Sequence, residues 1–143
     1  MDKEKLLQDL CARLPFGVRC SFGVDDAVYE ITGINPSACG ASEIQATHVK
    51  SGINGDFRLS SCKPYLFPLS SMTEEQYYEL QNCSSDDCLE HMELVKTLRD
   101  YTDFTHWPLY SYRVIDWFHK NHLDYRGLIP MGLAKDATGL NIY

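Results

Sequence analysis

The sequence has no long hydrophobic run and fewer basic than acidic residues. No stretch approaches the roughly 18 apolar residues of a membrane-spanning helix, and residues 1–5 are mostly charged, unlike the basic and then apolar start of an export signal. The 13 Lys and Arg residues against 20 Asp and Glu give a formal net charge of −7. Because nonspecific binding to nucleic acid or to an anionic membrane needs a basic surface, we expect a cytoplasmic protein with neither partner.

Motifs of catalysis are also missing. The six cysteines form no C-x-x-C pair, and without an export signal we expect reduced thiols rather than a disulfide framework. The glycines of residues 51–55 lack the Lys-Ser/Thr pair of a phosphate-binding loop, and the sequence has no G-x-S-x-G nucleophile elbow. We therefore predict that the protein is not an enzyme, with no catalytic residue and no cofactor.

What the sequence does contain is typical of a folded globule. Its 143 residues are 44% hydrophobic and 23% charged, close to the averages of globular domains. A chain of this length can bury a core without disulfides, and neither an internal repeat nor a low-complexity tract divides it. We expect a single globular domain over residues 1–143.

The N-terminal half carries a helical pattern followed by period-two patterns. Four leucines at helical spacing predict an amphipathic helix over residues 2–14. Alternating apolar residues then predict strands over 18–22, 28–32, 43–49 and 56–61. Residues 35–42 should form a loop, and Asn54-Gly55 indicates a tight turn. The expected inner face of the sheet comprises Val18, Cys20, Phe22, Tyr29, Ile31, Ile44, Ala46, Phe57 and Leu59.

The segment Cys62–Leu80 joins the strands to a helical half. Pro64 and Pro68 cannot donate backbone hydrogen bonds, so residues 63–69 are predicted to be extended at a sheet edge. A capping box and a hydrophobic staple then mark a helix start, formed by Thr73 with Gln76 and by Met72 with Tyr77.

The C-terminal half has helical periodicity. Its expected helices cover residues 73–81, 84 or 85 to about 101, and 111–122, and residues 123–133 should dock as short turns. The predicted fold is therefore α+β. It consists of an N-terminal helix, a small twisted antiparallel sheet or open barrel of about four strands, and about three helices packed on the sheet.

Two blocks of the sequence resemble a known group of proteins. KPYLFPLSSMTEEQ at 63–76 and IDWFHKNHLDYRGLIPMGLAKDA at 115–137 are similar to small proteins from phages and prophages of gut Bacteroidetes. The similarity covers roughly residues 17–137 and is strongest in those two blocks. The group brings no assigned function. The resemblance implies a context only, namely a phage-borne accessory protein in the cytoplasm of a bacterial host, and it names no site residue.

Two histidines of the predicted C-terminal helix are candidate metal ligands. His119 and His122 lie three residues apart and Asp124 follows them, a spacing that can bring two imidazoles to one metal ion. The alternative is a polar helix end at which His122 interacts with the helix dipole. We assign no metal site and keep the pair as a candidate.

Aromatic residues are abundant, at 12% of the chain with nine tyrosines. Many lie between residues 101 and 112 next to basic residues. Tyr and Trp suit a planar ligand or a protein interface, and Arg can bind phosphate or an acidic partner. The alternative is a core rich in tyrosine. The candidate ligand-binding residues are Arg99, Tyr101, His106, Trp107, Tyr110 and Arg113, with Arg58 and Lys63 as a second group beside the sheet.

Two functions of different classes fit these patterns. The first is non-enzymatic capture of a small anionic nucleotide-like ligand, such as a host immune signal that a phage quenches in counter-defence. The alternative is an interaction protein that binds and inhibits a host protein, or a structural phage accessory protein. Ligand capture predicts a concave pocket with convergent basic groups, which a homo-oligomer would build at a subunit interface. Binding of a host protein predicts a convex acidic or aromatic patch.

Overall fold

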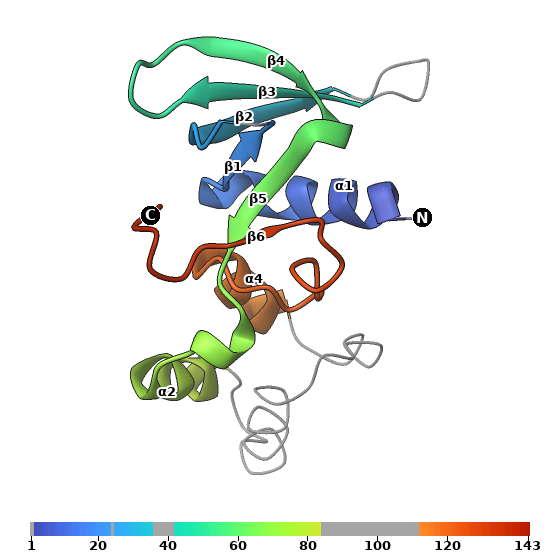
Figure 1. Cartoon of the computed structure of the whole chain (residues 1–143). Helices are drawn as coiled ribbons and strands as arrows, with labels where there is room; N and C mark the ends of the chain where they lie inside the picture. The colour runs from blue at the N-terminus through green and yellow to red at the C-terminus, as the bar shows by residue number, and fades with distance from the viewer. Residues whose placement is uncertain (1, 24, 36–41, 84–111) are drawn as a thin grey trace.

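The sheet and the first helix form one part of the molecule, and the other helices lie beyond it along strand β5 (Figure 1). The computed structural model describes residues 2–23, 25–35, 42–83 and 112–143. The fold is α+β, as the sequence predicts. The α-helices are α1 (Asp2–Arg13), α2 (Glu74–Cys83) and α4 (Tyr112–Lys120), and short 3-10 turns cover Leu14–Phe16, Leu59–Ser61 and Leu69–Ser71. The strands are β1 (Arg19–Phe22), β2 (Tyr29–Asn35), β3 (Glu43–His48), β4 (Asn54–Arg58), β5 (Cys62–Leu66) and β6 (Lys135–Asp136).

The sheet is larger than predicted. Among the described residues it has six strands in the order β4-β3-β2-β1-β5-β6, so the prediction of about four strands is wrong. Strands β1 to β5 pair antiparallel with their neighbours, whereas β5 and β6 pair in parallel. Strand β5 as a whole therefore lies inside the sheet, but Pro64 itself pairs only with β1, so the predicted edge position holds at this residue. Proline is tolerated there because the short β6 pairs only beyond it, with Tyr65 and Leu66.

The tight turn between β3 and β4 lies earlier in the chain than predicted. Asn54 and Gly55 belong to β4, and the chain turns at residues 49–52. Gly52 has a φ of 70° there, a conformation that glycine adopts without steric cost, and its N–H donates to the His48 carbonyl at 2.8 Å. Gly55 serves a different purpose, because a Cβ at this position would lie 2.9 Å from the Phe57 ring.

Helix α1 packs on part of one face of the sheet. Its Leu6 and Leu10, about one turn apart, belong to one buried apolar cluster with residues of β1 to β3. Burial of each such side chain contributes about 1.5–3 kcal/mol, so this contact is a main source of stability. The predicted inner face is confirmed in this region. We call it the covered end of the sheet, defined by Val18, Cys20, Ile31 and Ile44.

A buried ion pair joins α1 to the C-terminal segment. Asp9 and Arg13 have fully buried side chains one helical turn apart, with Arg13 Nε 2.7 Å from Asp9 Oδ2. Arg13 Nη2 donates to the Leu123 carbonyl at 2.7 Å, and Arg126 Nε lies 3.3 Å from Asp9 Oδ1. Removing one partner from a buried charge pair costs several kcal/mol. These contacts therefore fix the position in which α1 docks.

Residues 123–133 form turns, as predicted, and one carboxylate organises them. Asp124 is buried, and its two oxygens accept hydrogen bonds from the backbone N–H groups of Leu128 and Ile129, each at 2.8 Å. Burial raises the pKa of Asp124, and these two hydrogen bonds partly offset that rise. The carboxylate thus replaces the backbone partners that a helix or strand would supply.

Helices α2 and α4 pack in a second apolar cluster. The predicted capping box of α2 is confirmed, since the Thr73 N–H donates to Gln76 Oε1 at 3.0 Å and the Gln76 N–H donates to Thr73 Oγ1 at 3.2 Å. The helix predicted from residue 84 or 85 to 101 lies outside the described residues, as do residues 36–41 of the predicted loop. The buried members of the cluster are Leu69, Met72, Leu80, Val114, Trp117, Phe118, Leu123 and Tyr125.

Candidate ligand-binding site

Four aromatic rings extend the face of the sheet on which α1 packs. Tyr29 lies opposite His48 in the pairing of β2 with β3, and Phe57 lies opposite Ile44 in the pairing of β3 with β4. Directly paired residues share a face of the sheet, so these rings continue the face of the covered end. Their rings are only partly buried. We call this region the aromatic end, defined by Phe22, Tyr29, His48 and Phe57.

The four rings are packed against one another. Phe22 stacks on Phe57 with ring centroids 4.0 Å apart and planes 7° apart. Tyr29 meets Phe57 edge to face at 5.0 Å and His48 edge to face at 5.1 Å. Such pairs contribute roughly 0.5–1.5 kcal/mol beyond the area they bury. The aromatic end is therefore a preformed arrangement of rings.

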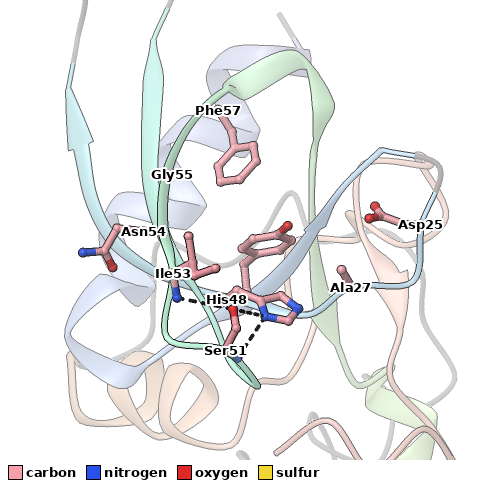
Figure 2. Close-up of a pocket in the computed structure, with 9 residues that line it drawn as sticks. Asp25, Ala27, His48, Ser51, Ile53, Asn54, Gly55 and Phe57 are labelled. Carbon is pink, nitrogen blue, oxygen red and sulfur yellow. Dashed lines mark hydrogen bonds between the residues drawn. The ribbon is translucent and has the colours of Figure 1, made fainter.

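A cavity of about 270 Å³ opens at the aromatic end. Figure 2 shows the Phe57 ring and the His48 ring pointing into it, with Asp25 at its margin. Tyr29 also lines the cavity. Phe22 does not line it, but its ring stacks on the Phe57 ring. The space is close to the lower limit of small-molecule pockets, which are typically about 300–1,000 Å³. It suits one planar ring system.

The hairpin turn fixes the orientation of His48. Its Nδ1 accepts a hydrogen bond from the backbone N–H of Ser51 at 3.1 Å and lies 2.7 Å from Ser51 Oγ. The N–H of Ile53 donates to the same hydroxyl at 3.4 Å. Figure 2 shows these contacts as dashed lines on the turn side of the imidazole. His48 is therefore held from one side, and its other ring nitrogen faces away from Ser51.

A second cavity, of about 670 Å³, is lined by Arg19 and Tyr65, whose side chains the strand register places on the opposite face of the sheet from Tyr29. The two cavities share Ala27 and His48 as lining residues. The second contains two cationic side chains, Arg19 and Lys50, against one carboxylate, Asp26. It has the size of a typical ligand pocket, and one of its two cations, Arg19, already lies 3.7 Å from the Glu30 carboxylate.

Tyr143 links two residues that line one wall of the second cavity, Arg19 and Tyr65. Its hydroxyl donates to the Tyr65 carbonyl at 2.7 Å and accepts from the Arg19 N–H at 3.1 Å. Burial raises the pKa of Tyr143 to about 12, so this hydroxyl stays protonated at neutral pH. Arg19 also donates through Nη1 to the Ile142 carbonyl, and its Nε lies 3.7 Å from a carboxylate oxygen of Glu30. This wall is held by hydrogen bonds from three parts of the chain.

None of the described residues among those predicted for ligand binding lines these cavities. Arg58 and Lys63 are exposed on β4 and β5, and Arg113 is exposed on α4, but none of the three belongs to either cavity. Arg58 lies opposite Glu43 in the sheet register. The remaining candidates lie outside the described residues: Arg99, Tyr101, His106, Trp107 and Tyr110.

The two candidate metal ligands have different surroundings. His119 is buried, and its Nε2 lies 2.8 Å from the hydroxyl of Tyr125, whereas the His122 ring stacks on Tyr143 with centroids 3.6 Å apart. The pKa of each histidine is lowered to about 4, mainly by burial and to a smaller extent by the nearby Arg13. Among the described residues, no group of three His, Cys, Asp or Glu side chains could hold a metal ion.

The residues that line the two cavities were not predicted from the sequence to be site residues. Phe22, Tyr29 and Phe57 were predicted on the inner face of the sheet but were interpreted as core. The period-two pattern carries no information on where the covering helix ends. The one usable signal was histidine and serine in a hairpin turn next to aromatic strand residues.

Comparisons with known proteins do not assign the chain to a family. The chain matches no protein-family model, no curated protein and no solved structure. Within the part of the chain that the structure describes, no helix is long and apolar enough to cross a membrane.

Proposed function

We propose that the protein is a non-enzymatic binding protein that captures a small anionic nucleotide-like ligand. The observation that carries this proposal is a preformed aromatic cavity that shares Ala27 and His48 with a second cavity, which holds two cationic side chains. A nucleotide has the same two parts, a planar base and an anionic phosphate. Neither cavity alone would favour this ligand class over others.

The base would bind in the aromatic cavity. Stacking on an aromatic side chain contributes roughly 1–3 kcal/mol per base and is tolerant of sequence. Phe57 offers such a ring, backed by Phe22 at 4.0 Å, and Tyr29 and His48 line the same space. Because these rings are already packed together, little side-chain freedom is lost on binding.

The phosphate would bind in the larger cavity. Lys50 is exposed on the hairpin turn and makes no ion pair with a described residue, so its ammonium group is available. Arg19 is partly committed to Glu30 and would contribute less. Asp26 opposes an anion, but its side chain is fully exposed and Lys135 Nζ lies 4.0 Å from it, so its charge is screened.

Titration calorimetry with 5′-AMP, cyclic di-AMP and adenosine tests the proposal. We expect Phe57→Ala to weaken binding of all three about tenfold or more through lost stacking. Lys50→Ala should weaken only the two phosphate-containing ligands, by about threefold to tenfold. Lys63→Ala is the matched control, because Lys63 is exposed but lines neither cavity. Absence of binding to the wild-type protein, or equal effects of the two lysine variants, would reject the proposal.

Because the sequence resembles phage proteins, host signalling nucleotides are the first ligands to test. A phage-borne capture protein acts in counter-defence if its ligand is a host signalling nucleotide. Native mass spectrometry of the protein purified gently from bacteria with active defence systems would detect a ligand that copurifies. An added mass that disappears on denaturation supports capture, and its value identifies the ligand class.

One observation favours the alternative, an interaction protein that binds a host protein. Three apolar side chains near the cavities are exposed, Ile53 at 69%, Leu140 at 54% and Val49 at 40%. Clustered apolar exposure is a feature of protein interfaces. A pull-down from host lysate with the wild-type protein and with Ile53→Asp tests this alternative, which requires a defined partner that the variant loses.

A further inference from the structure

The tautomer of His48 follows from its contacts. A backbone N–H can only donate, and the N–H of Ser51 points to His48 Nδ1 at 3.1 Å, so Nδ1 must carry a lone pair. The Ser51 hydroxyl, 2.7 Å from the same nitrogen, then shares this one lone pair as a second donor. In the neutral imidazole the proton then lies on Nε2.

The surroundings hold this ring rigidly. The turn that carries it is closed by the hydrogen bond from the Gly52 N–H to the His48 carbonyl at 2.8 Å. Tyr29 packs edge to face against the imidazole at 5.1 Å. Ser51 thus acts on one side of the ring, and the opposite nitrogen, Nε2, points away from the turn (Figure 2). The hydrogen bonds of the described residues leave this Nε2–H without an acceptor.

We propose that His48 Nε2–H is the donor that selects a phosphate-bearing ligand, and that Ser51 is the positioning residue that keeps the proton on this nitrogen. This inference rests on the proposed function. It narrows the ligand class to nucleoside phosphates and excludes uncharged nucleosides as the preferred ligand.

The location of His48 supports a phosphate oxygen as the acceptor. His48 is one of the residues that line both cavities, and Figure 2 shows its imidazole pointing into the aromatic cavity. Lys50 is two residues away on the same turn and lines the cationic cavity. Hydrogen bonds to a charged acceptor are shorter and roughly twice as strong as neutral ones, so a fixed N–H beside a lysine discriminates in favour of an anion.

The test combines a tautomer measurement with ligand titration. Two-bond ¹H–¹⁵N spectra of the imidazole are recorded at alkaline pH, where ordinary histidines are neutral, for the wild-type protein, Ser51→Ala and Ser51→Thr. Titration calorimetry with 5′-AMP and adenosine is carried out on the same three proteins. Ser60→Ala is the matched control, an exposed serine that lines neither cavity.

We expect the wild-type ring to be protonated at Nε2 and the Ser51→Ala ring to be a mixture of tautomers. Ser51→Ala should weaken AMP binding about fivefold to tenfold and change adenosine binding less than about twofold, whereas Ser51→Thr should restore both the tautomer and the AMP affinity. A wild-type ring protonated at Nδ1, or unchanged AMP affinity in Ser51→Ala, overturns the inference and leaves the proposed function intact. If the wild-type protein binds neither ligand, the proposed function fails, and the inference falls with it.

Discussion

The covered end and the aromatic end of the sheet share one face but differ in what lies over them. At the covered end, Ile44 is fully buried beneath the leucines of α1. Its direct partner on the neighbouring strand, Phe57, is only partly buried and lines a cavity. One alternating pattern of apolar residues therefore supplies both a core and a candidate binding surface.

The difference arises from the reach of α1. The helix has 12 residues and is about 18 Å long at 1.5 Å per residue. Within that length, buried Arg13 must also bond to Leu123 and buried Asp9 must pair with Arg126. These contacts restrict where the helix can lie on the sheet. A residue on the inner face of the sheet therefore becomes part of the core where α1 covers it and part of a cavity wall where α1 does not.

The largest effect is expected from breaking the contact that anchors α1. Arg13→Ala leaves the Asp9 carboxylate buried with Arg126 as its remaining partner, and we expect a loss of about 3 kcal/mol or more in the free energy of unfolding. Urea denaturation followed by circular dichroism measures this loss. Replacing both charges, Asp9→Leu with Arg13→Met, should cost much less, because no unpaired buried charge remains.

The control for the charge pair is Lys3→Ala, on the exposed side of the same helix, which should change stability by less than about 0.5 kcal/mol. Equal instability of the single and double variants would contradict the prediction. The ion pair would then act through packing volume rather than through charge.

The pair Ile44 and Phe57 tests the comparison most directly. Ile44→Ala should lower the free energy of unfolding by about 2–5 kcal/mol, as expected for a large-to-small change in a core, and leave AMP binding by the folded protein unchanged. Phe57→Ala should cost less stability, because its ring is partly exposed, and should weaken AMP binding. If Phe57→Ala destabilised the protein as much as Ile44→Ala without any loss of binding, the aromatic end would be ordinary core.

Acidification should weaken the region around the anchor. In the folded protein the pKa of His119 is about 4, whereas an unfolded histidine titrates near 6.5. Between these values the unfolded chain binds more protons, so stability falls as pH drops from about 6.5 to 4, by on the order of 3 kcal/mol for this residue. Denaturation midpoints measured across that range test the prediction.

The matched variant for this measurement is His119→Gln, which retains a hydrogen-bonding group beside Tyr125 but does not titrate. Its stability should decline less steeply with acidification. The raised pKa of Asp124 acts in the opposite direction, but it is present in both proteins and cancels in the difference. Parallel pH profiles of the two proteins would refute the assignment to His119.

The smallest effect is expected at the glycine beneath the aromatic cavity. A Cβ at Gly55 would meet the Phe57 ring at 2.9 Å, so Gly55→Ala should displace that ring and cost about 1 kcal/mol. Changes in the Phe57 ring resonances report the displacement. Gly33→Ala is the matched control, because the closest atom to its Cβ, at 2.7 Å, would be Oε1 at the end of the flexible Gln45 side chain. Similar ring shifts in both variants would show that the effect is not local.

Local features of the fold could be predicted from the sequence. The first helix, the early strands and the capping box of Thr73 with Gln76 depend on residues close together in the chain, and the structure confirms them. The pairing of β5 with β6 could not be predicted, because β6 has two residues and joins Tyr65 to Lys135 across the chain. The four-strand prediction failed because it missed β6 and counted β5 only as an extended segment at an edge.

The candidate site was less predictable than the fold. The residues chosen as candidates were selected by local crowding of aromatic and basic side chains, whereas the cavities form where separate strands and the C-terminal segment meet. Arg19 and Leu140 line one cavity although they lie at opposite ends of the chain. The burial of Arg13 was equally hidden, since nothing near it in sequence indicates that Leu123 provides its partner.

The hydrogen bond from Arg13 to Leu123 spans 110 residues, and this separation constrains the order of folding. At roughly 5–20 residues per second, a ribosome needs about 5–20 s to make the second partner after the first. During that interval the arginine lacks the Leu123 carbonyl and the aspartate lacks Arg126. The buried charges of the N-terminal helix can therefore be fully partnered only after the C-terminal segment has been made, so the final docking of α1 is completed late.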